Sequence, residues 1–247
     1  MQMVTHRSWA DVGAEGNSLS VRFERLLKTS GMDAASGARK GRAAGVGGLA
    51  GTKLQIAEAA LETLKSMGFA GASARAIAHQ GRFNQALIFY HFGSVQTLLL
   101  AAFDLISDRR MQEYGPQIEA AVSAPELARL ARRIYDDDLE RGYVTALGEM
   151  VAGGVSDPVL GAEVAARIEP WIEMVEGKLG HLLQGSAMLS LVAPTELAFG
   201  IVASYFGVDM LSHLQQDRSR ADSLLDLAER VADLADTVLP RPGQMSP

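Results

Sequence analysis

The sequence predicts an all-α protein, with a three-helix segment before a longer helical bundle. Apolar residues recur at helical spacing along most of the chain, and no stretch of useful length alternates between apolar and polar residues as a half-buried strand does. Glycine and proline separate the periodic segments. With 247 residues, 48% of them hydrophobic, the chain can bury a large core, and two domains are expected.

The first predicted helix covers residues 53–67. Thr52 and Gln55 match a T-x-x-Q capping box, whose two side chains satisfy free amides at the start of a helix. The apolar face that follows consists of Leu54, Ala57, Leu61 and Leu64. Gly68 ends this pattern and suits the left-handed position just after a helix, because it has no Cβ.

A second, shorter helix is predicted from Ser73 to about Gln80. Ser73 is a suitable N-cap, because its hydroxyl can accept a hydrogen bond from an amide of the first turn. Ile77 then faces inward and Arg75 outward. We expect Gly81 to take the positive φ that the following turn requires.

Asn84 is the predicted N-cap of a third helix. Ile88 and Phe92 lie four residues apart and share its buried face. Gln85, Ala86, Phe89 and Tyr90 lie largely on the other faces of this helix. Two short helices joined by a glycine turn, the second with an amide and aromatic residues facing outward, are typical of a helix-turn-helix, whose second helix enters the DNA major groove.

The segment resembles the DNA-binding domain of the TetR family of bacterial one-component repressors. The residues in register with that family's pattern are Ser73, Arg75, Ile77, Ala78, Asn84, Ile88, Phe89, His91, Phe92 and Ser94. The resemblance implies base or sugar-edge contacts from Gln85, Ala86 and Leu87. It implies phosphate contacts from Tyr90, His91 and the neighbourhood of Ser94.

Three positions depart from the family pattern. Phe89 stands where tyrosine is usual and has no hydroxyl for a phosphate, and Val95 replaces a lysine. The turn reads Gly81-Arg82 in place of Ala-Gly, so Arg82 can restore part of the lost charge. His91 can equally be a histidine packed in the core or a residue that contacts phosphate. The predicted DNA-binding residues are Arg75, Arg82, Asn84, Gln85, Ala86, Leu87, Phe89, Tyr90, His91 and Ser94.

Charge is divided unequally along the chain. Residues 1–110 carry a net charge of +5 and residues 111–247 carry −11, so the total of −6 conceals a basic half where nucleic acid is expected to dock. Residues 1–51 are predicted to be a flexible extension containing a basic cluster, Arg39, Lys40 and Arg42. Such an arm can enter an adjacent minor groove. A solvated tail, or a start codon placed too early, is the alternative that we favour.

The rest of the chain is predicted to be helical. A fourth helix covers about 95–110, and the later ones about 125–141, 143–152, 159–184, 195–215 and 219–239, with breaks that include Gly115-Pro116. The expected domains are a DNA-binding domain over 52–98 and a ligand-binding and dimerisation domain over 99–240, followed by a tail over 241–247. With no run of 18 apolar residues, no signal peptide and no cysteine, a cytoplasmic location is expected.

The segment 195–215 carries a stripe of small residues at helical spacing that allows another helix to approach closely. The predicted dimer contact consists of Gly200, Ala203, Ser204, Gly207 and Leu211. The partner is either another helix of the same chain or the same helix of a second subunit. The resemblance favours a homodimer through 159–184 and 195–215.

Aromatic and methionine residues of the second domain suit an adaptable apolar pocket, although core packing explains each one equally well. The predicted ligand set is Phe103, Tyr135, Tyr143, Met150, Trp171, Met174, Tyr205 and Met210. Asp136, Asp137 and Asp138 are consecutive and therefore point in different directions along a helix, so a solvated acidic face is expected in place of a metal site.

The sequence therefore predicts a ligand-responsive transcriptional regulator, most simply a repressor that a small apolar effector releases from a palindromic double-stranded operator. No catalytic residue, cofactor or membrane association is expected, because no P-loop, G-x-S-x-G, H-E-x-x-H or dinucleotide fingerprint occurs. The alternatives are a related helical protein with weakened DNA binding that binds small molecules, and a helical-bundle enzyme.

Overall fold

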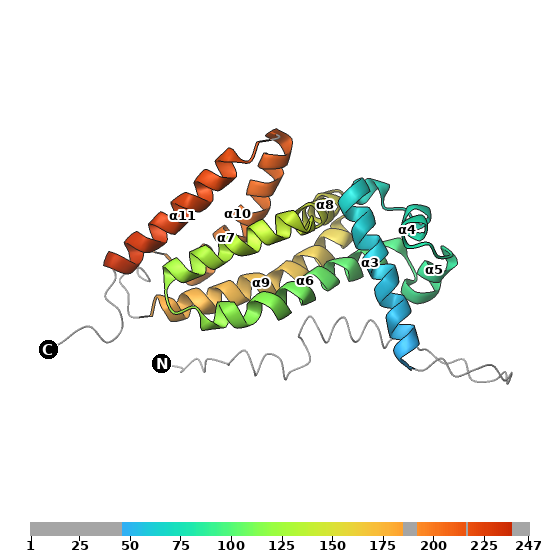
Figure 1. The fold of residues 1–247 in the computed structure, drawn as a ribbon, viewed down its shortest axis with the longest axis horizontal. Coiled ribbons are helices and arrows are strands. Elements are labelled where there is room, and N and C mark those ends of the chain that lie inside the picture. Colours follow the sequence, from blue (N-terminus) through green and yellow to red (C-terminus); the bar gives the residue numbers. More distant parts are fainter. Residues whose placement is uncertain (1–45, 185–191, 216, 239–247) are drawn as a thin grey trace. The chain divides into compact units, whose positions relative to one another are not determined.

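The computed structural model describes residues 46–184, 192–215 and 217–238 (Figure 1). These residues form nine helices and no strand, which confirms the predicted all-α class. Their bounds in chain order are α3 (Val46–Gly71), α4 (Ala74–Gly81), α5 (Ala86–Phe92), α6 (Val95–Ala120), α7 (Ala124–Glu140), α8 (Tyr143–Ser156), α9 (Pro158–Leu182), α10 (Pro194–Gln215) and α11 (Ser219–Val238). The chain divides into two compact units between Arg109 and Arg110, inside α6.

Helix α3 begins earlier than predicted, at Val46. Thr52 and Gln55 therefore lie within the helix, so the predicted capping box is wrong, and the residues just before Thr52 are helical where irregular structure was expected. Gly68 does break the helix, with φ of 69° and ψ of −179°. The predicted break at Gly68 is confirmed, with a positive φ that favours glycine, although its ψ lies outside the left-handed helical region.

The turn after α4 places the left-handed residue one position later than predicted. Ser73 caps α4 as expected, accepting a hydrogen bond from the Ala76 amide at 3.2 Å. The positive φ, however, belongs to Arg82, at 55°, and the Gly81 prediction is wrong. Gly81 is needed for packing instead, because an added Cβ would lie 2.2 Å from the Phe83 ring and 2.8 Å from the Ala59 Cβ.

Helix α6 has 26 residues and runs through the predicted break at Gly115-Pro116. Tyr114 and Ile118, on either side of the proline, are buried together with Leu130 and Ile134 of α7. This packing keeps the segment helical even though a proline removes one helix hydrogen bond. The break predicted there is therefore wrong.

In the second unit, glycines bring α8 and α9 into backbone contact. A Cβ on Gly161 would lie 2.7 Å from the Gly154 carbonyl oxygen, so both positions exclude a side chain. Pro170 lies inside α9. The predicted helices from α7 to α11 agree with the structure to within a few residues.

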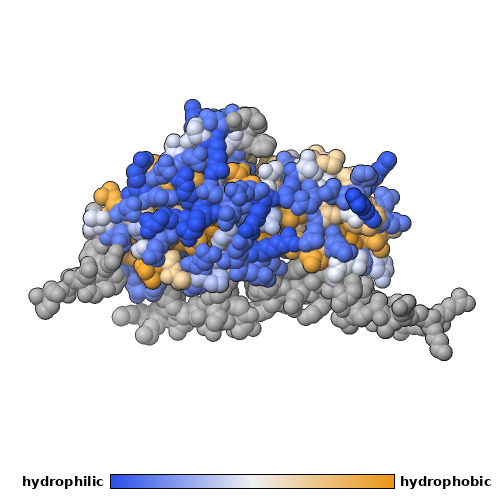
Figure 2. Space-filling model, viewed as in Figure 1, coloured by the Kyte–Doolittle hydropathy of each residue, from blue (hydrophilic) through white to orange (hydrophobic). Residues whose placement is uncertain are grey.

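No single helix among the described residues is long and apolar enough to cross a membrane, and the pair α5 and α6, which passes by composition when joined, is bent by 71°. On the face drawn in Figure 2, hydrophobic residues form only small areas among hydrophilic ones.

Candidate functional site

Helix α5 presents an exposed face of the kind the sequence predicted. Ile88 is fully buried and Phe92 nearly so, whereas Gln85, Ala86, Phe89 and Tyr90 are exposed. Phe89 retains 51% and Tyr90 74% of its accessible surface. Gln85 and Phe89 are four residues apart, and so are Ala86 and Tyr90, so the two pairs form adjacent stripes on one side of the helix. Two exposed aromatic rings beside an amide are costly to leave in water unless a partner covers them.

Two arginines lie close to this face in the chain. Arg75 is exposed on α4, and Arg82 is exposed in the turn before α5. The left-handed conformation of Arg82 lets the Phe83 amide donate to the Ala78 carbonyl oxygen at 3.0 Å, which terminates α4. Residues 46–109 carry five basic and four acidic side chains, so most of the basic surplus of residues 1–110 comes from outside the described residues.

Asn84 and Ser94 both act as caps. The Asn84 Oδ1 accepts a hydrogen bond from the Ala86 amide at 2.9 Å, so Asn84 caps α5 although the helix itself begins at Ala86. The Ser94 Oγ accepts from the Thr97 amide at 3.0 Å and lies 2.9 Å from the Thr97 hydroxyl. Ser94 is therefore the N-cap of α6. A serine directly before the predicted start of a helix at about residue 95 could have indicated this role.

His91 lies in the interior rather than on the predicted phosphate-binding face. Only 5% of its surface is exposed, and burial together with the positive charge of Lys53 lowers the pKa of its imidazole. A buried, neutral imidazole is poorly suited to contact phosphate, so the structure contradicts that part of the prediction. Leu87 is half-buried. The predicted arm, Arg39, Lys40 and Arg42, lies outside the described residues.

The predicted ligand residues do not form a single group. Trp171 and Tyr205 lie against the Arg110 guanidinium in the second unit, and Tyr135 packs on Tyr205, whereas Met174 packs on the cluster around Tyr114. Tyr143 and Met150 are buried, and Phe103 is buried in the first unit. Met210 keeps 49% of its surface, so it does not line an enclosed site.

Sequence reasoning missed the charged groups at the centre of the second unit. Arg110 and Asp138 are 8% and 0% exposed, and the Arg110 Nη2 lies 2.8 Å from the Asp138 Oδ2. The Tyr205 hydroxyl donates to the same Oδ2 at 2.9 Å. The Arg110 guanidinium carbon lies 4.5 Å from the centre of the Trp171 ring and 5.2 Å from that of Tyr205. The sequence signal that could have indicated this pair is a charged residue, Arg110 or Asp138, at a position that the helical spacing of apolar residues places in the core.

Helix α6 carries a second set of buried charges. Asp104 is fully buried and Asp108 is 9% exposed, four residues further along the same helix. Burial and the neighbouring charge of Asp104 raise the pKa of Asp108 to about 7. Two acids at this spacing within the apolar run before Arg109 were also visible in the sequence.

The acidic run on α7 divides among separate partners, as helix geometry requires. Arg218 pairs with Asp136, the Tyr114 hydroxyl donates to Asp137 at 2.5 Å, and Arg110 pairs with Asp138. Within the described residues, no group of three histidine, aspartate or glutamate side chains could hold a metal ion.

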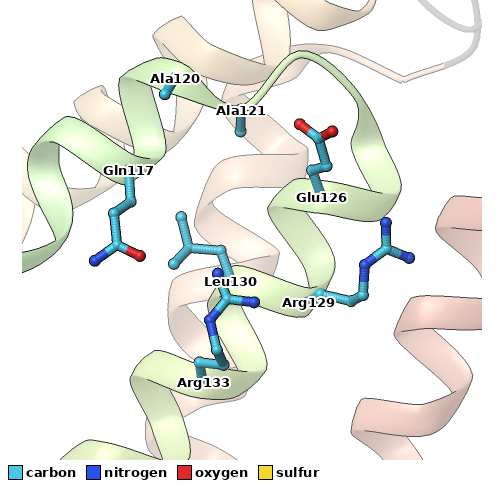
Figure 3. A pocket seen from close by; sticks show the side chains of 7 residues that line it. All are labelled: Gln117, Ala120, Ala121, Glu126, Arg129, Leu130 and Arg133. Carbon is cyan, nitrogen blue, oxygen red and sulfur yellow. The ribbon is translucent and has the colours of Figure 1, made fainter.

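A shallow pocket lies between the end of α6 and the start of α7 (Figure 3). Leu130 lies near its centre, and the lining residues are Gln117, Ala120, Ala121, Glu126, Arg129, Leu130 and Arg133. Glu126 accepts a hydrogen bond from the Val122 amide, and Arg129 lies 3.6 Å from Asp233 of α11. None of the predicted ligand residues lines this pocket.

The predicted dimer residues of α10 are accessible. Ala203, Ser204, Gly200 and Leu211 are exposed, and an added Cβ at Gly200 or Gly207 would meet no atom within 4 Å. The small-residue stripe is therefore not covered by the described helices of its own chain.

Comparison with known proteins identifies the fold. No protein-family model and no curated protein matches the chain by sequence. A TetR-family transcriptional regulator from Cytophaga hutchinsonii superimposes with a TM-score of 0.63 at 16% identity, covering 74% of this chain and 93% of its own. A TetR transcriptional regulator from Legionella pneumophila gives 0.60 at 22% identity, covering 73% and 97%. FadR from Bacillus subtilis, in complex with stearoyl-CoA, gives 0.55 at 15% identity, covering 74% and 97%.

These neighbours are transcriptional regulators, and the chain has the fold of the TetR family. The resemblance found at the helix-turn-helix is thus confirmed for the fold of the greater part of the chain.

Proposed function

We propose that this chain is a ligand-responsive DNA-binding transcriptional regulator, acting as a cytoplasmic homodimer that represses by binding a palindromic operator. The observation that carries the proposal is the exposed face of α5, where Gln85, Ala86, Phe89 and Tyr90 lie together beside the cations Arg75 and Arg82. An amide at the start of such a helix can read base edges, and the arginines can neutralise phosphates. The TetR fold supports this assignment.

The test of DNA binding compares two kinds of variant on fragments selected from genomic DNA. Gln85→Ala is expected to reduce discrimination between operator and unrelated duplex, by roughly 1–3 kcal/mol if its contact is bidentate. Arg82→Gly removes the cation but keeps the left-handed turn. It is expected to weaken binding to all duplexes and to make the DNA affinity less dependent on salt concentration. Gln112→Ala and Arg220→Ala, at exposed positions of the second unit, are the matched controls.

A protein that binds small molecules but has weak DNA affinity is the second candidate. Phe89 and Val95 lack the hydroxyl and the cation of the family pattern, and the described part of the first unit is nearly neutral. Salt-dependent retention on duplex DNA separates the two functions. If wild type and all four variants bind every duplex equally and weakly, the regulator assignment is wrong.

Two helices supply the proposed dimer contact, because their apolar sides are exposed in the single chain. Helix α11 turns its acidic side to α7, where Arg132 pairs with Asp226 and lies within 4 Å of Asp222 and Glu229. Its exposed side carries Leu224, Leu227, Val231 and Leu234. The small-residue stripe of α10 is exposed too, apart from Gly207, which is half-buried. An amphipathic helix whose apolar side faces solvent calls for a partner.

A second copy of the chain is the proposed partner, joined through α10 and α11 in place of the α9 and α10 pair that the sequence suggested. One recognition helix contacts only a few base pairs, whereas two related by a twofold axis enter successive major grooves. A stable contact of this kind buries on the order of 2,000 Å² or more. The exposed leucines and valine supply the apolar centre it needs.

Light scattering tests this interface. Gly207→Glu and Leu227→Glu are expected to produce helical monomers that lose operator binding, because each forces a charge into the contact. Gly177→Glu, on α9, is the matched control, since Gly177 is exposed and has no atom within 4 Å of an added Cβ. Monomers from Gly177→Glu alone would instead place the interface on α9.

The second unit is the proposed effector-binding part. The FadR neighbour holds stearoyl-CoA, which supports binding of a ligand with a large apolar part by this fold. Linkage requires an effector that lowers operator affinity to bind the DNA-free protein more tightly by the same factor. Measuring operator affinity with and without a saturating compound tests the proposal, and an operator affinity that no bound compound lowers would contradict it.

A further inference from the structure

The buried pair Arg110–Asp138 has incomplete hydrogen bonding. The Asp138 Oδ2 receives two donors, the Arg110 Nη2 at 2.8 Å and the Tyr205 hydroxyl at 2.9 Å. The Asp138 Oδ1 and the Arg110 Nε are buried and have no hydrogen-bond partner among the described residues. Buried polar atoms without partners are rare in folded proteins, because each loses its hydrogen bonds to water without replacement. A structural ion pair alone does not require this arrangement.

The walls around the guanidinium are those of a cation site. Trp171 of α9 and Tyr205 of α10 lie 4.5 and 5.2 Å from it, and Tyr135 packs edge-on against Tyr205 with ring centres 5.6 Å apart. Aromatic faces attract cations, most strongly where water is excluded. Asp138 supplies a fully buried carboxylate, and Asp209 adds negative charge near both tyrosines.

The neighbouring cations are engaged elsewhere. Arg141 makes two hydrogen bonds with Glu113, and Arg218 pairs with Asp136 and Asp222. Arg110 is therefore the cation that the aromatic walls and Asp138 hold. Its guanidinium is carried on a flexible stem from α6, so it can leave while the walls remain.

We propose that Trp171, Tyr205 and Asp138 form a binding site for a planar organic cation, an amidinium or guanidinium group, which Arg110 occupies as a tethered substitute. A ligand cation would displace the Arg110 head group, stack on the two rings and donate an N–H to the Asp138 Oδ1. The site then takes a cationic effector, not the purely apolar one expected from the sequence. This proposal depends on the proposed function only because it treats the second unit as the effector-binding part.

The test uses benzamidinium chloride, with neutral benzamide of the same shape as the control. Arg110→Ala empties the site, so benzamidinium is expected to raise its thermal unfolding midpoint by several degrees, and benzamide is not. Wild type is expected to show a smaller rise, because Arg110 competes. Adding Asp138→Asn to Arg110→Ala is expected to abolish the rise. Equal effects of the two compounds, or a rise that survives Asp138→Asn, would overturn the proposal.

A second measurement covers the case in which Arg110→Ala does not fold. Refolding of that variant is then measured with each compound: recovery with benzamidinium alone supports the site, and recovery with neither or with both overturns it. Tryptophan fluorescence of folded Trp9→Phe protein, in which Trp171 is the remaining tryptophan, gives an independent binding curve, and affinity is expected to weaken at least about tenfold when Asp138→Asn is added. These experiments contain no DNA. Loss of DNA binding would therefore refute the proposed regulator while leaving the cation site, and absence of cation binding would refute the site alone.

Discussion

Asp108 should make the stability of the protein depend on pH between about pH 4 and pH 7. Its pKa is about 7 in the folded protein against 3.8 when unperturbed, because the side chain is buried and lies one turn from Asp104. Within this range the folded protein holds a proton that the unfolded chain has released. Stabilisation by Asp108 is therefore present below pH 4 and is lost as the pH rises to 7.

The magnitude follows from the two pKa values. Each pKa unit corresponds to about 1.4 kcal/mol, so the free energy of unfolding falls by at most about 4 kcal/mol across the range. Asp108→Asn removes the ionisation and keeps the shape. It should be more stable than wild type at pH 7.5 and lose that advantage as the pH falls.

Urea unfolding of both proteins at several pH values between 4.5 and 7.5 measures this difference. Asp217→Asn is the control, because Asp217 is exposed and hydrogen bonds from Ser219 lower its pKa, so it stays charged throughout. A difference between wild type and Asp108→Asn that does not change with pH would refute the reasoning.

Three further predictions concern stability. Ser73→Ala removes the N-cap of α4 and should cost about 0.5–2 kcal/mol in urea unfolding; no loss would show that the cap is dispensable. Gly81→Ala should destabilise, because its Cβ meets neighbouring side chains, whereas Gly177→Ala, at an exposed position inside α9 where an added Cβ meets no atom within 4 Å, should stabilise by about 0.5–1 kcal/mol; calorimetry showing equal effects would contradict the packing argument. Tyr205→Phe removes the hydroxyl that donates to Asp138 and should cost about 0.5–1.5 kcal/mol, with unchanged chemical denaturation as the contrary result.

The local features of the fold were predictable, because they depend on residues adjacent in the chain. Ser73 as a cap, Gly68 as a terminator and the buried pair Ile88 and Phe92 all follow from short-range spacing, and the structure confirms them. The exposed face of α5 follows from the same periodicity. Its predicted contacts with DNA stay predictions.

The errors arise where tertiary contacts override local preference. Sequence alone could not show that the glycine at position 81 serves packing instead of a positive φ, because the Phe83 ring and the Ala59 Cβ that exclude a side chain there are brought close by the fold. Pro116 was read as a break, yet burial of the side chains around it keeps α6 continuous. Likewise, the convergence of Trp171 and Tyr205 on Arg110 depends on how three helices pack, which residue spacing within each helix does not reveal.

The ionic attachment of α11 affects how salt experiments on this protein must be interpreted. Arg132 and Arg129 hold that helix through carboxylates that are partly in water, and added ions screen such pairs. Raising the salt concentration therefore loosens α11 and also weakens the contacts between the protein and the DNA phosphates. A slope of DNA affinity against salt would count both events and overstate the number of phosphates contacted. Titrating the DNA-free protein with potassium glutamate, and monitoring hydrogen exchange of α11, measures the loosening of this helix alone, which can then be subtracted from the salt dependence of DNA affinity.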